Sequence, residues 1–296
     1  MTNPLPNKQL IARSFGQAAA HYDDVAVLQR QTADELLDRL SLVTLQPKRI
    51  LDLGTGTGRN LSLLAKRYPK AQLVAVDIAP QMVEQAQKSY QQAEGLKRWL
   101  PSQRPYYLAG DAEQLPLADN SVDLVFANLA LQWCDPRQSF AEIQRMLRPD
   151  GLLMFSTLGP DTLYELRQSW AAVDDYPHVN MFYDMHDIGE AMTAVGLADS
   201  VLDTDRYTLT YQTAMALMKD LKVLGASNVN AGRRRGLTGK KALEIVAETY
   251  EQFRVDQLLP ATYEVIYGHA WAGQIKQHNE AGEVHIPIDQ IQRRTS

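Results

Sequence analysis

The residues with the clearest chemical use lie in one short loop, where Asp52 is followed by Gly54, Gly56 and Gly58 at every second position. Glycines let the backbone turn tightly and approach a ligand closely. A second acidic residue, Asp77, ends the next apolar run, where a carboxylate can accept hydrogen bonds from both hydroxyls of a ribose. These residue types indicate a nucleoside site.

The glycine spacing distinguishes two kinds of nucleoside ligand. The dinucleotide fingerprint G-x-G-x-x-G suits a pyrophosphate at a helix N-terminus, whereas this loop reads D-x-G-x-G-x-G. The carboxylate of Asp52 would repel a phosphate but suits a cation. The pattern favours S-adenosylmethionine, with its sulfonium and amino group, over a nicotinamide dinucleotide; a tight turn without a ligand is the plain alternative.

The elements around this loop are readable from the apolar pattern. The residues before Asp52 form a short buried strand, and Leu61, Leu64 and Ala65 share one face of the following helix. With the strand at 73–76 they make one βαβ unit. Further strands are predicted at 106–109, 122–127 and 152–156, and helices at 25–40, 81–90, 136–147 and 161–173. Strands alternating with helices indicate a doubly wound α/β sheet.

Ligands of such sheets bind beyond the carboxyl ends of the strands. Asp111 and Ala112 follow the third strand, so Asp111 is placed to accept from an adenine amino group. Asn128 begins the stretch NLALQW after the fourth strand, at the same edge. A turn-capping role is the alternative for Asp111.

The later chain is less regular. Strands are predicted at 201–211 and 263–267, with an insertion between them that we expect to lie over the ligand face as a lid. We therefore expect four parts: an N-terminal helical segment, 1–46, covering the ligand site; the α/β core, 47–211; a helical, basic lid insertion, 212–258; and the final strand with the tail, 259–296.

Composition narrows the class of protein. A hydrophobic content of 45% and a charged content of 22% are ordinary for a soluble globule, and a net charge of −5 argues against a general nucleic-acid binder. The single cysteine, Cys134, excludes an internal disulfide framework and predicts a cytoplasmic protein. Neither a membrane span nor a signal peptide is expected. The six histidines are scattered, so no metal site is expected.

At this level of detail the sequence resembles a known family. DLGTGTG, the strand end at Asp77, GDAEQLP and NLALQW resemble motifs I to III of class I S-adenosylmethionine-dependent methyltransferases. RSFGQAAAHYD, FSTLGPDTLYELR, HVNMFYDMHDIG, DLKVLGASN and ATYEVIYGHAW together resemble the malonyl-[acyl-carrier protein] O-methyltransferases of biotin synthesis. The resemblance covers residues 11–271 and implies a seven-stranded sheet whose last strand is antiparallel.

The resemblance also implies a reaction and a set of site residues. The free carboxylate of a malonyl-acyl carrier protein would be methylated by S-adenosyl-L-methionine in an in-line displacement, and this carboxylate needs no general base because it is already ionised. Arg167 is the candidate for holding the carboxylate, and Tyr22 and His178 are further catalytic candidates. We expect the cofactor to contact Asp52, Gly54, Thr55, Gly56, Gly58, Asp77, Ile78, Met82, Asp111, Ala112, Asn128, Leu129 and Gln132.

The resemblance also implies a protein partner, and it leaves alternative functions open. Acyl carrier proteins are acidic, so the run Arg233, Arg234, Arg235 is a candidate docking site, although such a run is more often simply solvated. The alternatives are a methyltransferase-fold protein that acts on another small carboxylate, a complex I assembly-factor-like protein and a non-catalytic binding module. Neither nucleic acid nor membrane is expected as a partner.

Overall fold

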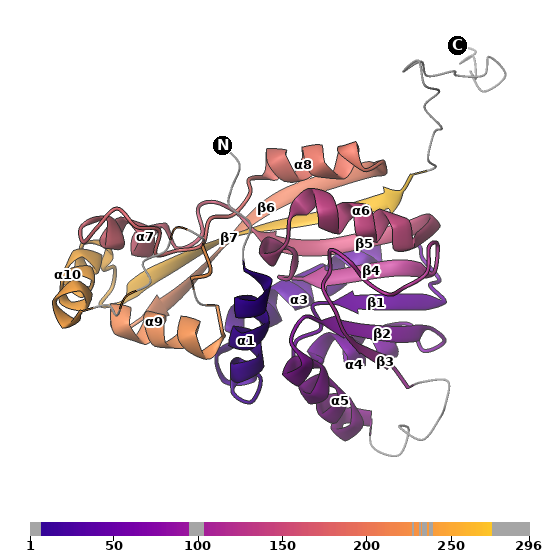
Figure 1. The fold of residues 1–296 in the computed structure, drawn as a ribbon, viewed down its shortest axis with the longest axis horizontal. Coiled ribbons are helices and arrows are strands. Elements are labelled where there is room, and N and C mark those ends of the chain that lie inside the picture. Colours follow the sequence, from indigo (N-terminus) through magenta and orange to yellow (C-terminus); the bar gives the residue numbers. More distant parts are fainter. Residues whose placement is uncertain are drawn as a thin grey trace, which may run out of the picture.

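A computed structural model describes residues 7–94, 104–226, 228–230, 232, 236 and 239–273. They form one seven-stranded sheet in the order β3-β2-β1-β4-β5-β7-β6 (Figure 1). Strands β1 to β5 pair in parallel, and β7 lies antiparallel between β5 and β6. The strands are β1 (Arg49–Leu53), β2 (Gln72–Asp77), β3 (Tyr106–Ala109), β4 (Val122–Asn128), β5 (Leu147–Leu158), β6 (Leu197–Tyr211) and β7 (Leu259–Ala272). The predicted sheet, with its antiparallel last strand, is confirmed.

Helices cover both faces of the sheet (Figure 1). One face packs against α3 and α4, and the opposite face packs against α6 and α8. Alternate strand residues supply the two cores: Ile50 and Phe126 lie in the first, Leu51 and Val125 in the second. The α-helices are α1 (Lys8–Ala18), α2 (Tyr22–Val25), α3 (Val27–Arg39), α4 (Arg59–Arg67), α5 (Pro80–Glu94), α6 (Pro136–Met146), α7 (Tyr164–Ala171), α8 (Met185–Ala194), α9 (Ala214–Val223) and α10 (Lys240–Tyr250).

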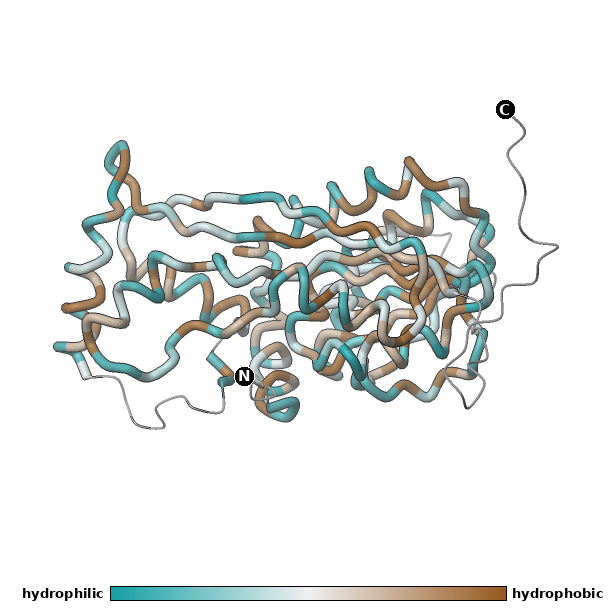
Figure 2. Tube along the Cα trace, turned by 90° about the horizontal axis from the view of Figure 1, so that it is seen from above, coloured by the Kyte–Doolittle hydropathy of each residue, from teal (hydrophilic) through white to brown (hydrophobic). Residues whose placement is uncertain are grey.

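The hairpin of β6 and β7 extends beyond the rest of the sheet. Its pairing runs from Leu197 opposite Ala272 to Tyr211 opposite Leu259, and its far end carries α7, α9 and α10 as a slender extension of the molecule (Figures 1 and 2). The fully buried Glu165 of α7 accepts hydrogen bonds from the backbone N–H and the hydroxyl of Thr262 on β7. A buried carboxylate is tolerated only when it is bonded in this way, so Glu165 fixes α7 to the hairpin.

Several predicted elements have different bounds in the structure. The strand predicted at 152–156 begins earlier, because β5 also includes residues 147–151, where its pairing with β4 shifts register and Asp150 adopts a φ of 61°. The last strand is longer than the predicted 263–267, because β7 is paired on both sides. The helix predicted over 161–173 is α7, confined to Tyr164–Ala171.

The N-terminal segment forms a helix, α1, that begins at Lys8, where the side chain of Asn7 accepts a hydrogen bond from the Leu10 N–H. Helices α9 and α10 lie between β6 and β7 in the chain, within the segment predicted to be a lid. Residues 233–235 and the tail after 273 lie outside the described residues. Within the described part of the chain, no helix is long and apolar enough to cross a membrane.

Candidate functional site

The glycine loop after β1 uses its three glycines differently. All three have positive φ, between 54° and 85°. A Cβ on Gly54 would lie 2.3 Å from Cβ of Ala130, and one on Gly58 would lie 2.7 Å from Cα of Ala86. A Cβ on Gly56 would meet nothing within 4 Å. Gly54 and Gly58 are therefore required by packing against the protein, whereas Gly56 faces open space in which a ligand can lie.

Asp77 ties this loop to the end of β2. Its Oδ2 accepts a hydrogen bond from the Gly56 N–H at 3.0 Å, and its Oδ1 accepts one from the Ala79 N–H at 2.9 Å. Burial raises the pKa of Asp77 to about 6. A carboxylate has about four acceptor sites, so each oxygen keeps capacity for a further donor from a ligand.

Asp52 lies beneath the loop and is 1% exposed. Its Oδ2 accepts from the hydroxyl of Thr55 at 2.6 Å, while its buried Oδ1 has no hydrogen-bond partner among the described residues. Burial, reinforced by the nearby Asp77, raises the pKa of Asp52 to about 7 although the Thr55 bond opposes the shift. An unpaired buried carboxylate oxygen is costly, and a donor or cation above the loop would relieve that cost.

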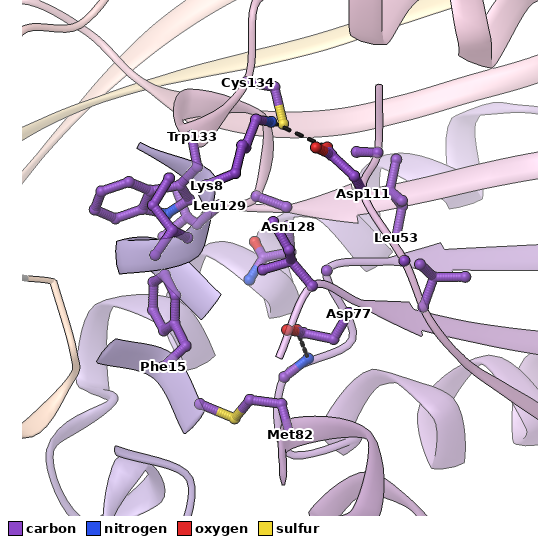
Figure 3. A pocket seen from close by; sticks show the side chains of 18 of the residues that line it. Lys8, Phe15, Leu53, Asp77, Met82, Asp111, Asn128, Leu129, Trp133 and Cys134 are labelled. Atoms are coloured by element: carbon purple, nitrogen blue, oxygen red, sulfur yellow. Dashed lines mark hydrogen bonds and ion pairs between the residues drawn. The ribbon is translucent and has the colours of Figure 1, made fainter. Parts of the chain in front are cut away.

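These groups border a first cavity at the carboxyl ends of β1 to β4 (Figure 3). The ends of β3 and β4 supply its far wall, and α5 and α1 complete it. Its lining includes Lys8, Ile11, Phe15, Tyr22, Gly54, Gly56, Asp77, Ile78, Met82, Asp111, Ala112, Asn128, Leu129, Trp133 and Cys134.

Helix α1 closes one side of the first cavity through Lys8. Its Nζ lies 3.0 Å from Oδ1 of Asp111 and 2.6 Å from Oε1 of Glu113, beside the thiol of Cys134 (Figure 3). Burial disfavours the ammonium, but Cys134 and the two carboxylates outweigh it and raise the pKa of Lys8. Asp111, the residue predicted to accept from adenine, is thus already paired with the Lys8 ammonium group through its Oδ1.

A second cavity shares Phe15, Tyr22, Leu129 and Trp133 with the first. None of the described residues lining it is Asp, Glu, Lys or Arg. Its polar lining consists of two tyrosines, a threonine, a histidine and four side-chain amides: Tyr22, Tyr263, Thr162, His178, Gln29, Gln132, Asn180 and Asn228.

Backbone strain also marks the second cavity. Leu129 and Leu163 line it with φ values of 47° and 54°, a conformation that is rare for a residue with a bulky side chain. Such strain concentrates at functional sites. Burial, with smaller contributions from Asp77 and Asp23, raises the pKa of Tyr22, so at the boundary between the two cavities its hydroxyl remains a hydrogen-bond donor.

A third cavity adjoins the second and contains Arg167. Nη2 of Arg167 donates to the carbonyl of Thr162 at 3.0 Å. His178, shared by both cavities, stacks on Trp170 with ring centroids 3.8 Å apart, and its Nε2 lies 2.7 Å from Oδ1 of Asp174. His178 is therefore fixed in the wall between the two cavities.

Comparison with known proteins agrees with this geometry. The model of a methyltransferase domain family matches residues 51–155. The malonyl-[acyl-carrier protein] O-methyltransferase of Laribacter hongkongensis is 49% identical over 90% of this chain and 89% of its own, and that of Halorhodospira halophila is 44% identical over 97% and 96%. The chain belongs to the malonyl-[acyl-carrier protein] O-methyltransferase family. The crystal structure of the [4+2]-cyclase SpnF superimposes with a TM-score of 0.58 at 18% identity, covering 93% of this chain and 100% of its own, which shows a shared fold only.

In this member of the malonyl-[acyl-carrier protein] O-methyltransferase family, most of the predicted cofactor residues meet in the first cavity. Gly54, Gly56, Asp77, Ile78, Met82, Asp111, Ala112, Asn128 and Leu129 line it, together with Tyr22. Asp52, Thr55 and Gly58 lie behind that wall and support the loop, whereas Gln132 faces the second cavity. The structure separates Arg167 and His178 from the first cavity.

Helix α1 and the loop after β4 contribute a part of the first cavity's wall that was not predicted from the sequence. Lys8, Ile11 and Phe15 line the first cavity from one face of α1, at the helical spacing i, i+3 and i+7. Trp133 packs edge-on against Phe15 with centroids 5.4 Å apart. That spacing was the available signal. Among the residues that the structure describes, no group of three or more histidine, cysteine, aspartate or glutamate side chains could hold a metal ion.

Proposed function

We propose that this chain methylates the free carboxylate of malonyl-[acyl-carrier protein] with S-adenosyl-L-methionine, an early step of biotin synthesis. The observation that carries the proposal is that the identity to the named relatives spans nearly the whole chain, and so includes the segments that build the second cavity as well as the methyltransferase motifs. A methyltransferase acting on a different acceptor would be expected to share only the motifs.

The first cavity fits S-adenosyl-L-methionine by its own chemistry. We assign the ribose hydroxyls to Asp77, whose oxygens keep free acceptor capacity. Gly56 gives the ligand room, and the unpaired Oδ1 of Asp52 provides negative charge on the side where the cationic tail would lie. Asp111 and the Ala112 N–H remain the proposed adenine contacts, which requires Lys8 to share Asp111 or to stay on Glu113 alone. When bound, this cofactor supplies an electrophilic methyl group.

The second cavity suits an acceptor that is already anionic. Its uncharged donors can position a carboxylate without neutralising the oxygen lone pair that attacks the methyl group, and exclusion of water removes the competing solvation. Tyr22 lines both cavities, so we assign its hydroxyl to orienting the carboxylate. Arg167, the candidate from the sequence, does not line the second cavity but donates to the carbonyl of Thr162, which does. We therefore rank Arg167 below Tyr22 as the group that orients the carboxylate.

Tyr22→Phe tests this assignment, because it removes the hydroxyl and keeps the ring. We expect methylation to slow by about tenfold, the value of roughly one lost hydrogen bond to a charged group, with cofactor affinity unchanged. Equal loss of cofactor affinity would assign Tyr22 to the cofactor instead.

The function itself is tested by mass spectrometry of malonyl-[acyl-carrier protein] after incubation with the protein and S-adenosyl-L-methionine. A mass increase of one methyl group, absent with acetyl-carrier protein, is the expected result. Unmodified malonyl-carrier protein, with the cofactor bound in a titration, would instead favour the binding-module or assembly-factor alternatives.

The carrier protein is proposed to dock through Arg233, Arg234 and Arg235. The support is sequence-based: three adjacent cations in a chain of net charge −5, offered to an acidic partner.

A further inference from the structure

The third cavity has no role in the function proposed so far. It shares His178, Val179 and Phe182 with the second cavity, so the two adjoin at these residues. Tyr176 and Met181, which also line it, are 53% and 59% exposed, so the third cavity opens to solvent at these residues. The three cavities thus lie one after another, from the glycine loop, past Tyr22, to the surface beside α7.

An acyl group on a carrier protein is the end of a long phosphopantetheine arm, joined to it as a thioester. When the malonyl carboxylate lies at Tyr22, the thioester and the arm must leave the second cavity by a continuous route. We infer that the third cavity is the binding groove for this arm, with Arg167 facing its phosphate. The inference rests on the proposed function, because it assumes a thioester-borne malonyl group.

The chemistry of the groove matches the parts of the arm. The stacked rings of Trp170 and His178 provide a flat wall for its methyl and methylene groups. Arg167 is the only lysine or arginine among the described residues that line the second and third cavities. An arginine has five N–H donors and stays charged; one nitrogen, Nη2, bonds the Thr162 carbonyl, which leaves donors for a phosphate.

Asp174 and Asp175 also line the groove, and their carboxylates would disfavour a phosphate nearby. Oδ1 of Asp174 is bonded to Nε2 of His178 and to the backbone N–H of Tyr176, so it serves to build the wall. The phosphate is therefore expected on the Arg167 side of the groove.

Three malonyl thioesters test the inference: the methyl thioester, which has no arm; the coenzyme A thioester, which has the arm without the protein; and the carrier-protein thioester. R167Q should raise KM roughly tenfold or more for the last two, as the loss of a charge-assisted hydrogen bond predicts, and should raise it far less for the methyl thioester. R67Q, the same substitution on α4, is the matched control. M181E places an opposing charge at an exposed position, where folding is not at risk, and should give the same substrate pattern.

An inhibition measurement completes the test. Phosphopantetheine without a malonyl group should inhibit the wild type competitively and should inhibit R167Q at least about tenfold less. Equal losses on all three thioesters would overturn the inference and assign Arg167 to the carboxylate. Unchanged KM values for the arm-bearing substrates in both variants would overturn it as well. If the wild type methylates none of the thioesters, the proposed function itself has failed.

Discussion

The first and second cavities meet at Tyr22 but have contrasting walls. The first contains charged groups: Asp77 and Asp111 face it, Asp52 lies beneath it, and Lys8 bridges its rim. The second has amides, hydroxyls, one histidine and apolar side chains among its described lining residues, with no carboxylate or strong cation. One half of the site is therefore suited to a cation and the other to an anion that must stay reactive.

The two cavities would therefore bind their ligands through different physical effects. Carboxylates on one side would stabilise a cationic ligand in a partly buried place, where Coulomb interactions are strong. Uncharged donors on the other side orient an anion without neutralising it. If the two halves really divide the work in this way, substitutions on each side should fail differently.

The largest effect is expected from Gly56→Val. The new side chain would fill the space in front of the loop, and a β-branched residue at a φ of 54° adds backbone strain. Titration should detect no cofactor binding, while the far-UV spectrum is retained. Gly196→Val is the matched control, since Gly196 also has a positive φ and open space but lies before β6, away from the first cavity. Equal binding losses in both variants would mean that strain alone is responsible.

Asp77→Ala should weaken cofactor binding by about 1–3 kcal/mol, the cost of leaving polar groups unpaired. The substitution also frees the N–H groups of Gly56 and Ala79. Isothermal titration with S-adenosylmethionine measures the loss, and binding of the acceptor should be unaffected. Unchanged cofactor affinity in a folded variant would remove Asp77 from the ribose site.

The acidic half should also respond to pH. Asp77 and Asp52 have pKa values raised from 3.8 to about 6 and about 7, so both take up protons as pH falls through that range. Affinity for the cationic cofactor should rise by about tenfold from pH 5 to pH 7, because the ionised fraction of a carboxyl with a pKa of about 6 rises about tenfold over that range. Asp77→Asn should flatten the lower part of this profile.

For the stability of the protein without ligand, the same two carboxyl groups predict a pH dependence of the opposite sign. Their raised pKa values mean that the folded chain binds more protons than the unfolded chain between about pH 4 and pH 7. Without ligand, stability should therefore fall as pH rises through this window. Parallel trends for affinity and for stability would contradict the assignment of these shifts to Asp52 and Asp77.

The smallest effect is expected at the proposed docking site. Neutralising Arg233, Arg234 and Arg235 together should raise KM for the carrier-bound substrate only severalfold at low salt, and the defect should shrink as salt screens the charges. Small malonyl thioesters should be unaffected at any salt concentration. A defect of equal size on both substrates would show that the cluster does not act in docking.

The sequence predicts most of the acidic half of the site but only part of the uncharged half, namely Tyr22, Leu129, Gln132 and His178, for a physical reason. The ends of parallel strands converge on one edge, so Asp77, Asp111 and Asn128 could be placed together from the strand pattern alone. The second cavity is assembled from distant segments, from Phe15 on α1 to Tyr263 on β7. No local periodicity specifies such contacts.

Two other misses have the same origin in long-range contacts. Lys8 meets Asp111 across 103 positions, and its pairing partners could not be read from α1. The strand β7 extends past its alternating segment because β5 and β6 pair with it on both sides.

The thiol of Cys134 gives this site a chemical reporter of its own. It is the only thiol in the chain, is 6% exposed, and lies in the wall of the first cavity against Lys8, with a pKa that burial raises to about 12. Alkylation of the native protein must wait for α1 to move away, because the thiolate is scarce and covered. The rate of single-site labelling therefore measures how often the cavity opens, without any engineered probe, and a ligand that holds α1 in place should lengthen the labelling time.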